Sequence, residues 1–245
     1  MLLDAPTLAA VALLGLGAAV IGAVGGFGTG IILTAALTPL IGVKALVPVL
    51  AVAGVIINSG RFWFYRKSLD KRSFAIVLAA ALPFLVLGTW IYSVLDARTL
   101  GVVLGLVILS SVPLRRILKK HEIVIGPGGL AVGGGVFGLA SGIATGTGVI
   151  LISLLLGSGI AGPAVLATDA LITIALDFSK ALLFGRFDLL DRQHFFTGVV
   201  IGVASIPGSA LGAFLVARMH AHLHVLFMEG LILVGGGFML WHSWS

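Results

Sequence analysis

Eight long apolar runs occupy almost the whole chain and restrict it to one kind of fold. A helix needs about 20 mostly apolar residues to cross a bilayer. The chain is 59% hydrophobic and 10% charged, and its charged share is far below the roughly 25% of soluble domains. This composition excludes a soluble enzyme and a nucleic-acid-binding module, and it predicts an all-α polytopic membrane protein with about eight transmembrane helices. The runs are residues 7–40, 43–65, 73–94, 98–114, 126–156, 160–184, 194–217 and 223–241.

Two of these runs are too long for one straight span, and glycines interrupt both. As continuous helices, residues 7–40 and 126–156 would be about 45–50 Å long, against a hydrocarbon core of about 30 Å. The interruptions fall at Gly22–Gly30 and Gly138–Gly148. We interpret each run as two half-helices around an unwound turn inside the membrane. Such a turn survives only where protein buries it or water reaches it.

The interruptions recur at a fixed distance, which indicates a duplicated chain. Gly28-Thr29-Gly30 and Gly146-Thr147-Gly148 are 118 residues apart, and so are the loops that end in Asp70 and Asp188. We therefore expect two four-helix repeats, each of which opens with a glycine-broken helix. The expected boundaries are 1–120 and 121–245 within one integral membrane domain.

The basic residues predict the orientation of these repeats. If every run crosses once, 12 of the 15 basic residues lie on one side, and the repeats are parallel. The positive-inside rule then places both termini in the cytoplasm. If each broken run crosses twice, the repeats are inverted and the basic residues divide ten to five, so we prefer the parallel alternative. The first run has no basic segment before it and is interpreted as a retained span of the inner membrane.

The duplicated turns have the chemistry of an anion site. A helix that starts within the membrane exposes unpaired N–H groups and the positive end of its dipole, and glycine lets a ligand approach the backbone. Paired broken segments in two halves indicate the substrate site of a transporter. Packing alone is the alternative interpretation of the glycines, and we favour it for 133–135. The predicted substrate-binding residues are Gly28, Thr29, Gly30, Asn58, Thr145, Gly146, Thr147 and Gly148.

Ionisable residues within the apolar runs form a second group of candidates, because each is costly in lipid unless it has a partner or a function. Asp169, Asp177 and Lys180 lie in the run 160–184, and we predict that they couple protons to transport or gate it. The i,i+3 spacing of Asp177 and Lys180 equally allows a structural ion pair. Asp169 has no partner nearby in the sequence, which favours a functional role. Glu229 is a weaker candidate.

No residue pattern indicates a metal, a cofactor or an enzyme. His220, His222 and His224 are interpreted as interfacial loop residues, because no carboxylate or further histidine accompanies them. The chain has no cysteine, no Walker sequence and no nucleophile–base pair in its core. We therefore expect transport driven by gradients.

The chain resembles the TauE/SafE sulfite-exporter family along its whole length. The similarity lies in Gly25–Gly30 followed by Pro39, in Gly142–Gly148, and in the loops ending in Asp70 and Asp188. Threonine stands at the centre of both Gly-Thr-Gly turns, where the family often has a third glycine. The resemblance implies an eight-span transporter of sulfite, thiosulfate, sulfoacetate or related sulfonates in the inner membrane.

Together these features predict a secondary transporter that exports a small sulfur-containing anion by alternating access. Its expected partners are the anion, the lipid bilayer and protons as the coupling ion. Two alternatives remain open. One is an anion channel, which shares the electrostatics; the other is an uptake permease for a different small organic or inorganic anion.

Overall fold

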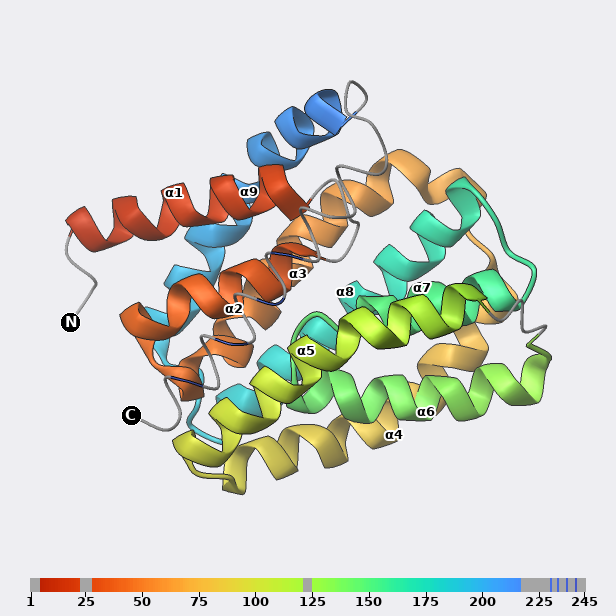
Figure 1. The fold of residues 1–245 in the computed structure, drawn as a ribbon, viewed down its shortest axis with the longest axis horizontal. Coiled ribbons are helices and arrows are strands. Elements are labelled where there is room, and N and C mark those ends of the chain that lie inside the picture. The colour runs from red at the N-terminus through yellow and green to blue at the C-terminus, as the bar shows by residue number, and fades with distance from the viewer. Residues whose placement is uncertain are drawn as a thin grey trace.

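The computed structural model describes residues 5–22, 28–120 and 125–216, together with residues 230, 233, 237 and 241. All regular structure within these residues is helical (Figure 1). The elements are α1 (Ala5–Gly22), α2 (Gly28–Ile41), α3 (Val43–Tyr65), the short 3₁₀ helix η1 (Arg66–Ser68), α4 (Lys71–Val94), α5 (Ala97–Lys120), α6 (Pro127–Ile143), α7 (Gly148–Gly157), α8 (Pro163–Arg186) and α9 (Arg192–Val216).

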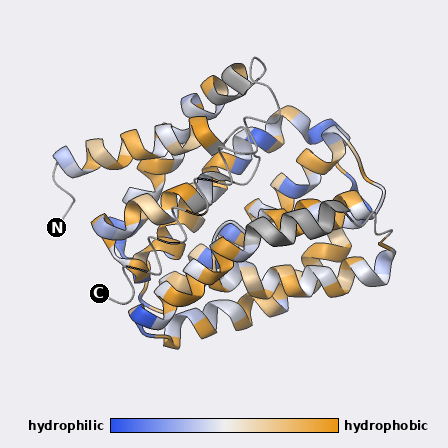
Figure 2. Cartoon of the chain, viewed as in Figure 1, coloured by the Kyte–Doolittle hydropathy of each residue, from blue (hydrophilic) through white to orange (hydrophobic). Residues whose placement is uncertain are grey.

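Apart from the turn at 144–147, the described residues of the first seven predicted runs are almost entirely helical, and the all-α class is confirmed for the part of the chain that the structure describes. Within the described residues, three helical segments are long and apolar enough to cross a membrane. They are α3 together with η1, α4, and α9. Figure 2 shows that hydrophobic residues predominate along the coloured parts of the helices. α8 is as long as these helices, but it carries Asp169, Asp177 and Lys180. The eighth run, 223–241, lies outside the described residues except for isolated positions.

The run 126–156 differs from our preferred single crossing, because it returns to the end from which it starts. The backbone N–H of Ile125 donates to the carbonyl of Gly157 over 2.7 Å, so the start of α6 lies beside the end of α7. Halfway along, the Leu154 side chain occupies the space beside Gly133. In one continuous helix, Ile125 and Gly157 would be about 48 Å apart. α6 and α7 therefore form a hairpin. Our preference for parallel repeats assumed that every run crosses the membrane once, and this run does not.

The turn of this hairpin is the predicted glycine break. Ala144 is extended, and Gly146 has a φ of 80°, a left-handed conformation that glycine adopts without a steric penalty. The first broken run is likewise two helices, and α1 and α2 pack side by side (Figure 1). Residues 23–27, which include part of the predicted first break, lie outside the described residues.

The remaining helices pack in a symmetric order. α3 and α8 are in contact at the centre, α9 packs beside α3, and α4 packs beside α8. α1 packs on the outer side of α9, and α6 packs on the outer side of α4. The packing order is α1, α9, α3, α8, α4, α6. Exchanging α1 with α6, α9 with α4 and α3 with α8 gives the same order read from the other end.

Glycines bring α6 unusually close to α4. A Cβ on Gly138 would overlap the backbone of Ala81, and a Cβ on Gly142 would lie 2.7 Å from the carbonyl oxygen of Leu85. At Gly134 the nearest backbone atoms, those of Val77, would be 3.2 Å away. Small residues at four-residue spacing let two helix backbones approach in a membrane. The packing interpretation of residues 133–135 is confirmed.

Loop aspartates fix where three of the helices begin. Asp70 accepts a hydrogen bond from the backbone N–H of Ser73 over 2.7 Å at the start of α4, and Asp191 does the same for His194 at the start of α9. Asp96 accepts from both the backbone N–H and the hydroxyl of Thr99. These bonds to the ionised form lower the pKa of Asp96. Asp191 is thus the capping counterpart of Asp70, and it lies 121 residues further along the chain rather than at the 118-residue spacing of Asp188.

Apart from the turn of the α6–α7 hairpin, the described connections gather at two ends of the molecule. We call one of these ends the basic end; it holds residues 66–72, 125–127 and 158–164. These segments line or adjoin a cavity of about 490 Å³. Four exposed cations lie there: Arg66, Lys67, Lys71 and Arg72. At the opposite end, the Tyr92 hydroxyl donates to the carbonyl of Val43 over 2.9 Å, and Phe187 packs into the same core.

The α6–α7 hairpin predicts a specific cross-link. The chain has no cysteine, so a variant with Ile125→Cys and Gly157→Cys contains only the introduced pair. We expect this pair to form a disulfide under mild oxidation, because a backbone hydrogen bond brings the two residues within disulfide range. A faster-migrating band on a non-reducing gel, which disappears when the sample is reduced, measures it. Ile125→Cys with Gly146→Cys is the control that should not cross-link, and equal behaviour of both pairs would contradict the hairpin.

Candidate functional site

A polar cavity of about 150 Å³ lies where α3 and α8 face the glycine-broken segments. It has room for several water molecules, since one water needs about 10–15 Å³ of such space. Helices α2, α3, α6, α7 and α8 all contribute to its wall. The polar or glycine residues that line it are Thr29, Gly30, Gly54, Asn58, Arg61, Ser141, Thr145, Gly146, Thr147, Gly148, Asp169, Thr173, Asp177 and Lys180.

The two Gly-Thr-Gly segments meet at this cavity. A Cβ on Gly30 would lie 3.5 Å from the backbone nitrogen of Gly146, so the start of α2 is in contact with the turn between α6 and α7. The hydroxyls of Thr34 and Thr145 share a hydrogen bond of 2.5 Å across this contact. Thr34 also donates to the carbonyl of Gly30 over 2.7 Å. The breaks from the two halves therefore form one continuous wall.

The start of α7 presents backbone donors to the cavity. Thr147 is the residue before α7, and its side chain makes no capping hydrogen bond to the helix. Thr147, Gly148 and the preceding Thr145 and Gly146 all line the cavity. The first N–H groups of a helix have no partner within the helix and carry the positive end of its dipole. An anion in the cavity would face these groups.

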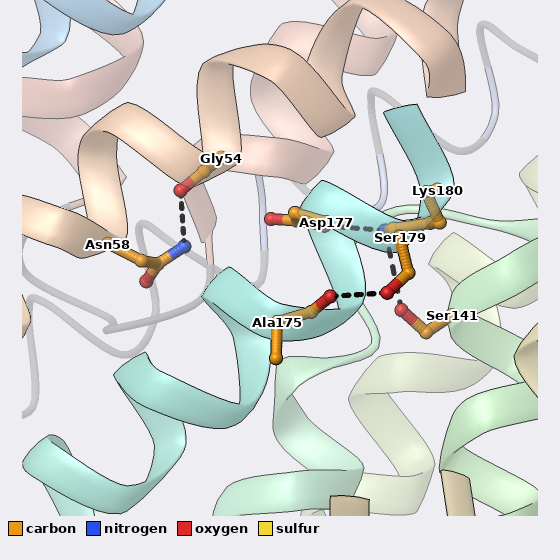
Figure 3. Close-up of polar contacts among 7 residues, drawn as sticks. All are labelled: Gly54, Asn58, Ser141, Ala175, Asp177, Ser179 and Lys180. Carbon is orange, nitrogen blue, oxygen red and sulfur yellow. Dashed lines mark hydrogen bonds and ion pairs between the residues drawn. The ribbon is translucent and has the colours of Figure 1, made fainter. Parts of the chain in front are cut away.

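Lys180 and Asp177 form a buried ion pair beside the turn. The Lys180 ammonium lies 2.7 Å from Asp177 Oδ1, and the two side chains are 6% and 9% exposed. The same ammonium donates to the hydroxyl of Ser141 on α6 over 3.4 Å. Figure 3 shows Lys180 between these two partners, with Ser179 directed instead to the carbonyl of Ala175. Lys180 thus faces the cavity and is held by Asp177.

Asp177 is close to α3, and glycine makes this approach possible. A Cβ on Gly54 would overlap the Asp177 carboxylate. One turn further along α3, the Asn58 amide donates to the carbonyl of Gly54 over 2.9 Å (Figure 3). Asn58 is buried, and it lines the same cavity. The predicted amide and carboxylate therefore lie at one depth on facing helices.

Asp169 has a partner that the sequence analysis did not identify. Arg61 of α3 forms an ion pair and a hydrogen bond with Asp169 of α8. The Asp169 side chain is 5% exposed and that of Arg61 is 26% exposed. Both residues line the cavity, on the side toward the basic end, because Arg61 lies in the last two turns of α3.

The structure brings almost all of the predicted site residues together. Thr29, Gly30, Asn58, the residues of 145–148, and the ionisable trio of α8 line one cavity. Gly28 is the first residue of α2. Arg61, Thr34 and Thr173 were not among the predicted site residues, and in the sequence Arg61 stands just before the loop cations at 66–72. The signal for Arg61 was its distance of 119 residues from Lys180, close to the repeat distance.

The histidine pattern cannot be placed. His220, His222, His224 and Glu229 lie outside the described residues. Among the residues that the structure describes, no three His, Cys, Asp or Glu side chains are grouped as metal ligands.

These observations define a class: a helical membrane protein with a small charged cavity between two glycine-broken helix pairs. A family model, sulfite exporter TauE/SafE, matches residues 11–239, which is nearly the whole chain. The chain belongs to the TauE/SafE sulfite-exporter family, a family of membrane transporters. Comparison with curated proteins and with solved structures found no match.

The buried ion pair of α8 leads to a stability prediction. Removing one partner leaves an uncompensated buried charge, which typically costs about 3–5 kcal/mol. Lys180→Met should therefore lower the free energy of unfolding by about this amount, while Asp177→Asn combined with Lys180→Met should lower it much less. Denaturant titration of the purified protein in detergent measures both. Lys44→Met, an exposed lysine on α3, is the matched control, and equal losses for the single and double variants would show that the pair is not coupled.

Proposed function

We propose that this protein is a secondary transporter that exports a small sulfur-containing anion across the cytoplasmic membrane by alternating access. The observation that supports this most is the meeting of both glycine-broken segments at one charged cavity. A family of sulfite exporters gives the transport class, and the cavity gives a place where a small oxyanion fits.

The anion-binding groups in this proposal come from the backbone and from hydroxyls. Gly28, Thr29 and Gly30 open α2, and Gly146, Thr147 and Gly148 open α7; each set would offer N–H and O–H donors to an oxyanion. Backbone donors that are held in place favour an anion because they need no reorganisation when it arrives. Asn58 and Thr145 would complete the site from α3 and from the turn.

Asp169, Asp177 and Lys180 serve as coupling groups in this proposal. Each carboxylate holds a cation in the cavity, so protonation of the carboxylate would release that cation toward the anion. Proton binding and anion binding would then favour each other. Through this linkage, the two buried ion pairs would make anion binding depend on pH.

We also propose that residues 1–120 and 121–245 are two repeats of inverted orientation. The symmetric packing order supports this, because α1 and α6 occupy equivalent places and run in opposite directions (Figure 1). Under this arrangement the ten-to-five division of basic residues applies. The positive-inside rule then assigns the basic end to the cytoplasm, and α1 starts at the opposite face rather than in the cytoplasm as first predicted.

A channel is the second candidate function, and the cavity argues against it. Its walls are closed by contacts such as Thr34 with Thr145 and Arg61 with Asp169. A continuous pore would need a wetted path to both ends. The arrangement instead suits a site that opens to one side at a time, as in transporters built from broken helices in two repeats.

Replacing the two turn threonines tests the binding site. We expect Thr29→Val and Thr147→Val to weaken anion binding by about 5- to 20-fold each, since each removes one hydrogen-bond donor without changing side-chain volume. Thermal stabilisation of the purified protein by sulfite, thiosulfate, sulfate and small sulfonates measures binding, and flux into proteoliposomes measures transport. Thr197→Val, a buried threonine on α9 away from the cavity, is the control. Unchanged binding and flux in both turn variants would remove these residues from the site.

Neutralising Asp169 tests the coupling role. In the wild type, anion binding should strengthen on acidification, because protonated Asp169 would no longer occupy Arg61. Asp169→Asn resembles the protonated state at every pH, so this part of the pH dependence should disappear while binding at low pH is retained. Flux measured between pH 5 and pH 8 checks this, with Asp96→Asn in an exposed loop as the control. An unaltered pH profile would exclude Asp169 from coupling.

A further inference from the structure

The cavity walls of α3 and α8 correspond to each other position by position. The two helices start 120 residues apart, at Val43 and Pro163. At an offset of 119, every lining residue of α8 matches a lining residue of α3. The matching pairs are Leu50 with Asp169, Gly54 with Thr173, Asn58 with Asp177, and Arg61 with Lys180.

This correspondence holds for the positive charges and fails for the negative ones. Arg61 and Lys180 are equivalent, so each half supplies one cation to the cavity. The carboxylates Asp169 and Asp177 both come from α8, and their α3 counterparts are Leu50 and Asn58. The site is therefore symmetric in the charges that attract an anion and asymmetric in those that repel it.

We infer that Arg61 and Lys180 together bind one divalent oxyanion, and that two protons enter with it, one on Asp169 and one on Asp177. This inference rests on the proposed function and adds the charge of the substrate and the number of protons. Each carboxylate takes its proton from the water on the side to which the cavity is open. Each returns it when the anion leaves.

The physical reason for the uptake of two protons is charge balance in a buried cavity. With both carboxylates ionised, the four side chains sum to zero, and a dianion would bring two uncompensated charges. The aspartate side chains are only 5% and 9% exposed, so such charges are poorly solvated there and costly. Two protons restore neutrality and leave two cations for two negative charges.

No other charged group within the described residues lines this cavity. The α2 wall and the α6–α7 turn contribute hydroxyls, glycines and apolar side chains. Tyr65, one turn beyond Arg61 on α3, is not among the residues that line the cavity. The proton count therefore belongs to Asp169 and Asp177, and Arg61 and Lys180 are the charged groups that face them.

Each of the two cations has a property that fits this role. Lys180 reaches Ser141 at 3.4 Å as well as Asp177 at 2.7 Å, so it stays oriented toward the cavity when Asp177 is neutral. Arg61 is a planar donor that can hold two oxygens of one anion at once. Arg61 is thus a further binding residue.

Calorimetric titration with thiosulfate tests this inference. Thiosulfate stays divalent across the neutral range, and methanesulfonate is the monovalent comparison. Titration of the full-length protein in two buffers of different ionisation enthalpy counts the protons taken up per anion. For the wild type with both aspartates ionised, we expect about two protons per thiosulfate and tighter binding than for methanesulfonate. Asp169→Asn should take up about one.

Variants of the cation separate binding from folding. Arg61→Gln with Asp169→Asn removes the whole pair and leaves no buried charge unpaired. It should bind thiosulfate on the order of 10- to 100-fold more weakly than Asp169→Asn alone. Arg66→Gln, which removes an exposed cation just beyond α3, is the control and should bind like the wild type. Thermal unfolding of each variant verifies that it is folded.

The outcomes distinguish this inference from the proposed function. Tight thiosulfate binding without proton uptake, or equal affinity of the Arg61→Gln double variant and Asp169→Asn, would overturn the inference and leave the transporter standing. Failure of the wild type to bind or move any sulfur anion would overturn both. In proteoliposomes, a dianion that moves with two protons is electroneutral. An imposed potential of 100 mV should then leave its accumulation unchanged rather than shift it on the order of a thousand-fold.

Discussion

The structure depends on one constraint: backbone that is not helical cannot face lipid, because its N–H and C=O groups have no partners there. The turn at Ala144–Thr147 breaks a helix inside an apolar run, so protein has to cover it. Helix α2 does this from the other half, through the contact of Gly30 with Gly146 and the hydroxyl pair of Thr34 and Thr145. The cavity is a consequence of this arrangement, since the start of α2 and the turn that it covers leave polar groups on their inner side.

The charged side chains follow from the same constraint. A single ion inside this bundle would be poorly solvated, and each of the four in the cavity wall has an opposite partner: Arg61 with Asp169, and Lys180 with Asp177. These pairs are weak evidence for stability, because hydrophobic residues of similar size often pack as well or better. Their position beside helix starts that favour anions is therefore the stronger argument for a role in binding.

Hydropathy predicted the helices, the positions of the glycines predicted the break before α7, and the duplicated turns and intramembrane charges predicted most of the residues that line the cavity. The lengths of α3, α4 and α9 follow from apolar runs between polar residues, and the interruption before α7 follows from its glycines. Whether a broken run crosses or turns back is not encoded in hydropathy. It depends on the left-handed Gly146 and on Leu154 fitting beside Gly133, which are tertiary features. Arg61 was not predicted as a site residue for a related reason. In the sequence it lies close to the loop cations, and only the packing of α3 against α8 places it in the cavity wall.

The close glycine contacts on the two flanks of this fold differ from the contacts at its centre, and the difference bears on how the cavity could open. Along α6, Gly138 and Gly142 press the backbone against α4, and on the other flank Gly208 of α9 meets the backbone of Leu16 in α1. Such contacts leave little freedom for the helices to slide, because any shift causes a clash. Between α3 and α8 the interface instead encloses the cavity and its ion pairs. This contrast supports movement of two stiff flanks about a polar centre, which is the motion that alternating access requires.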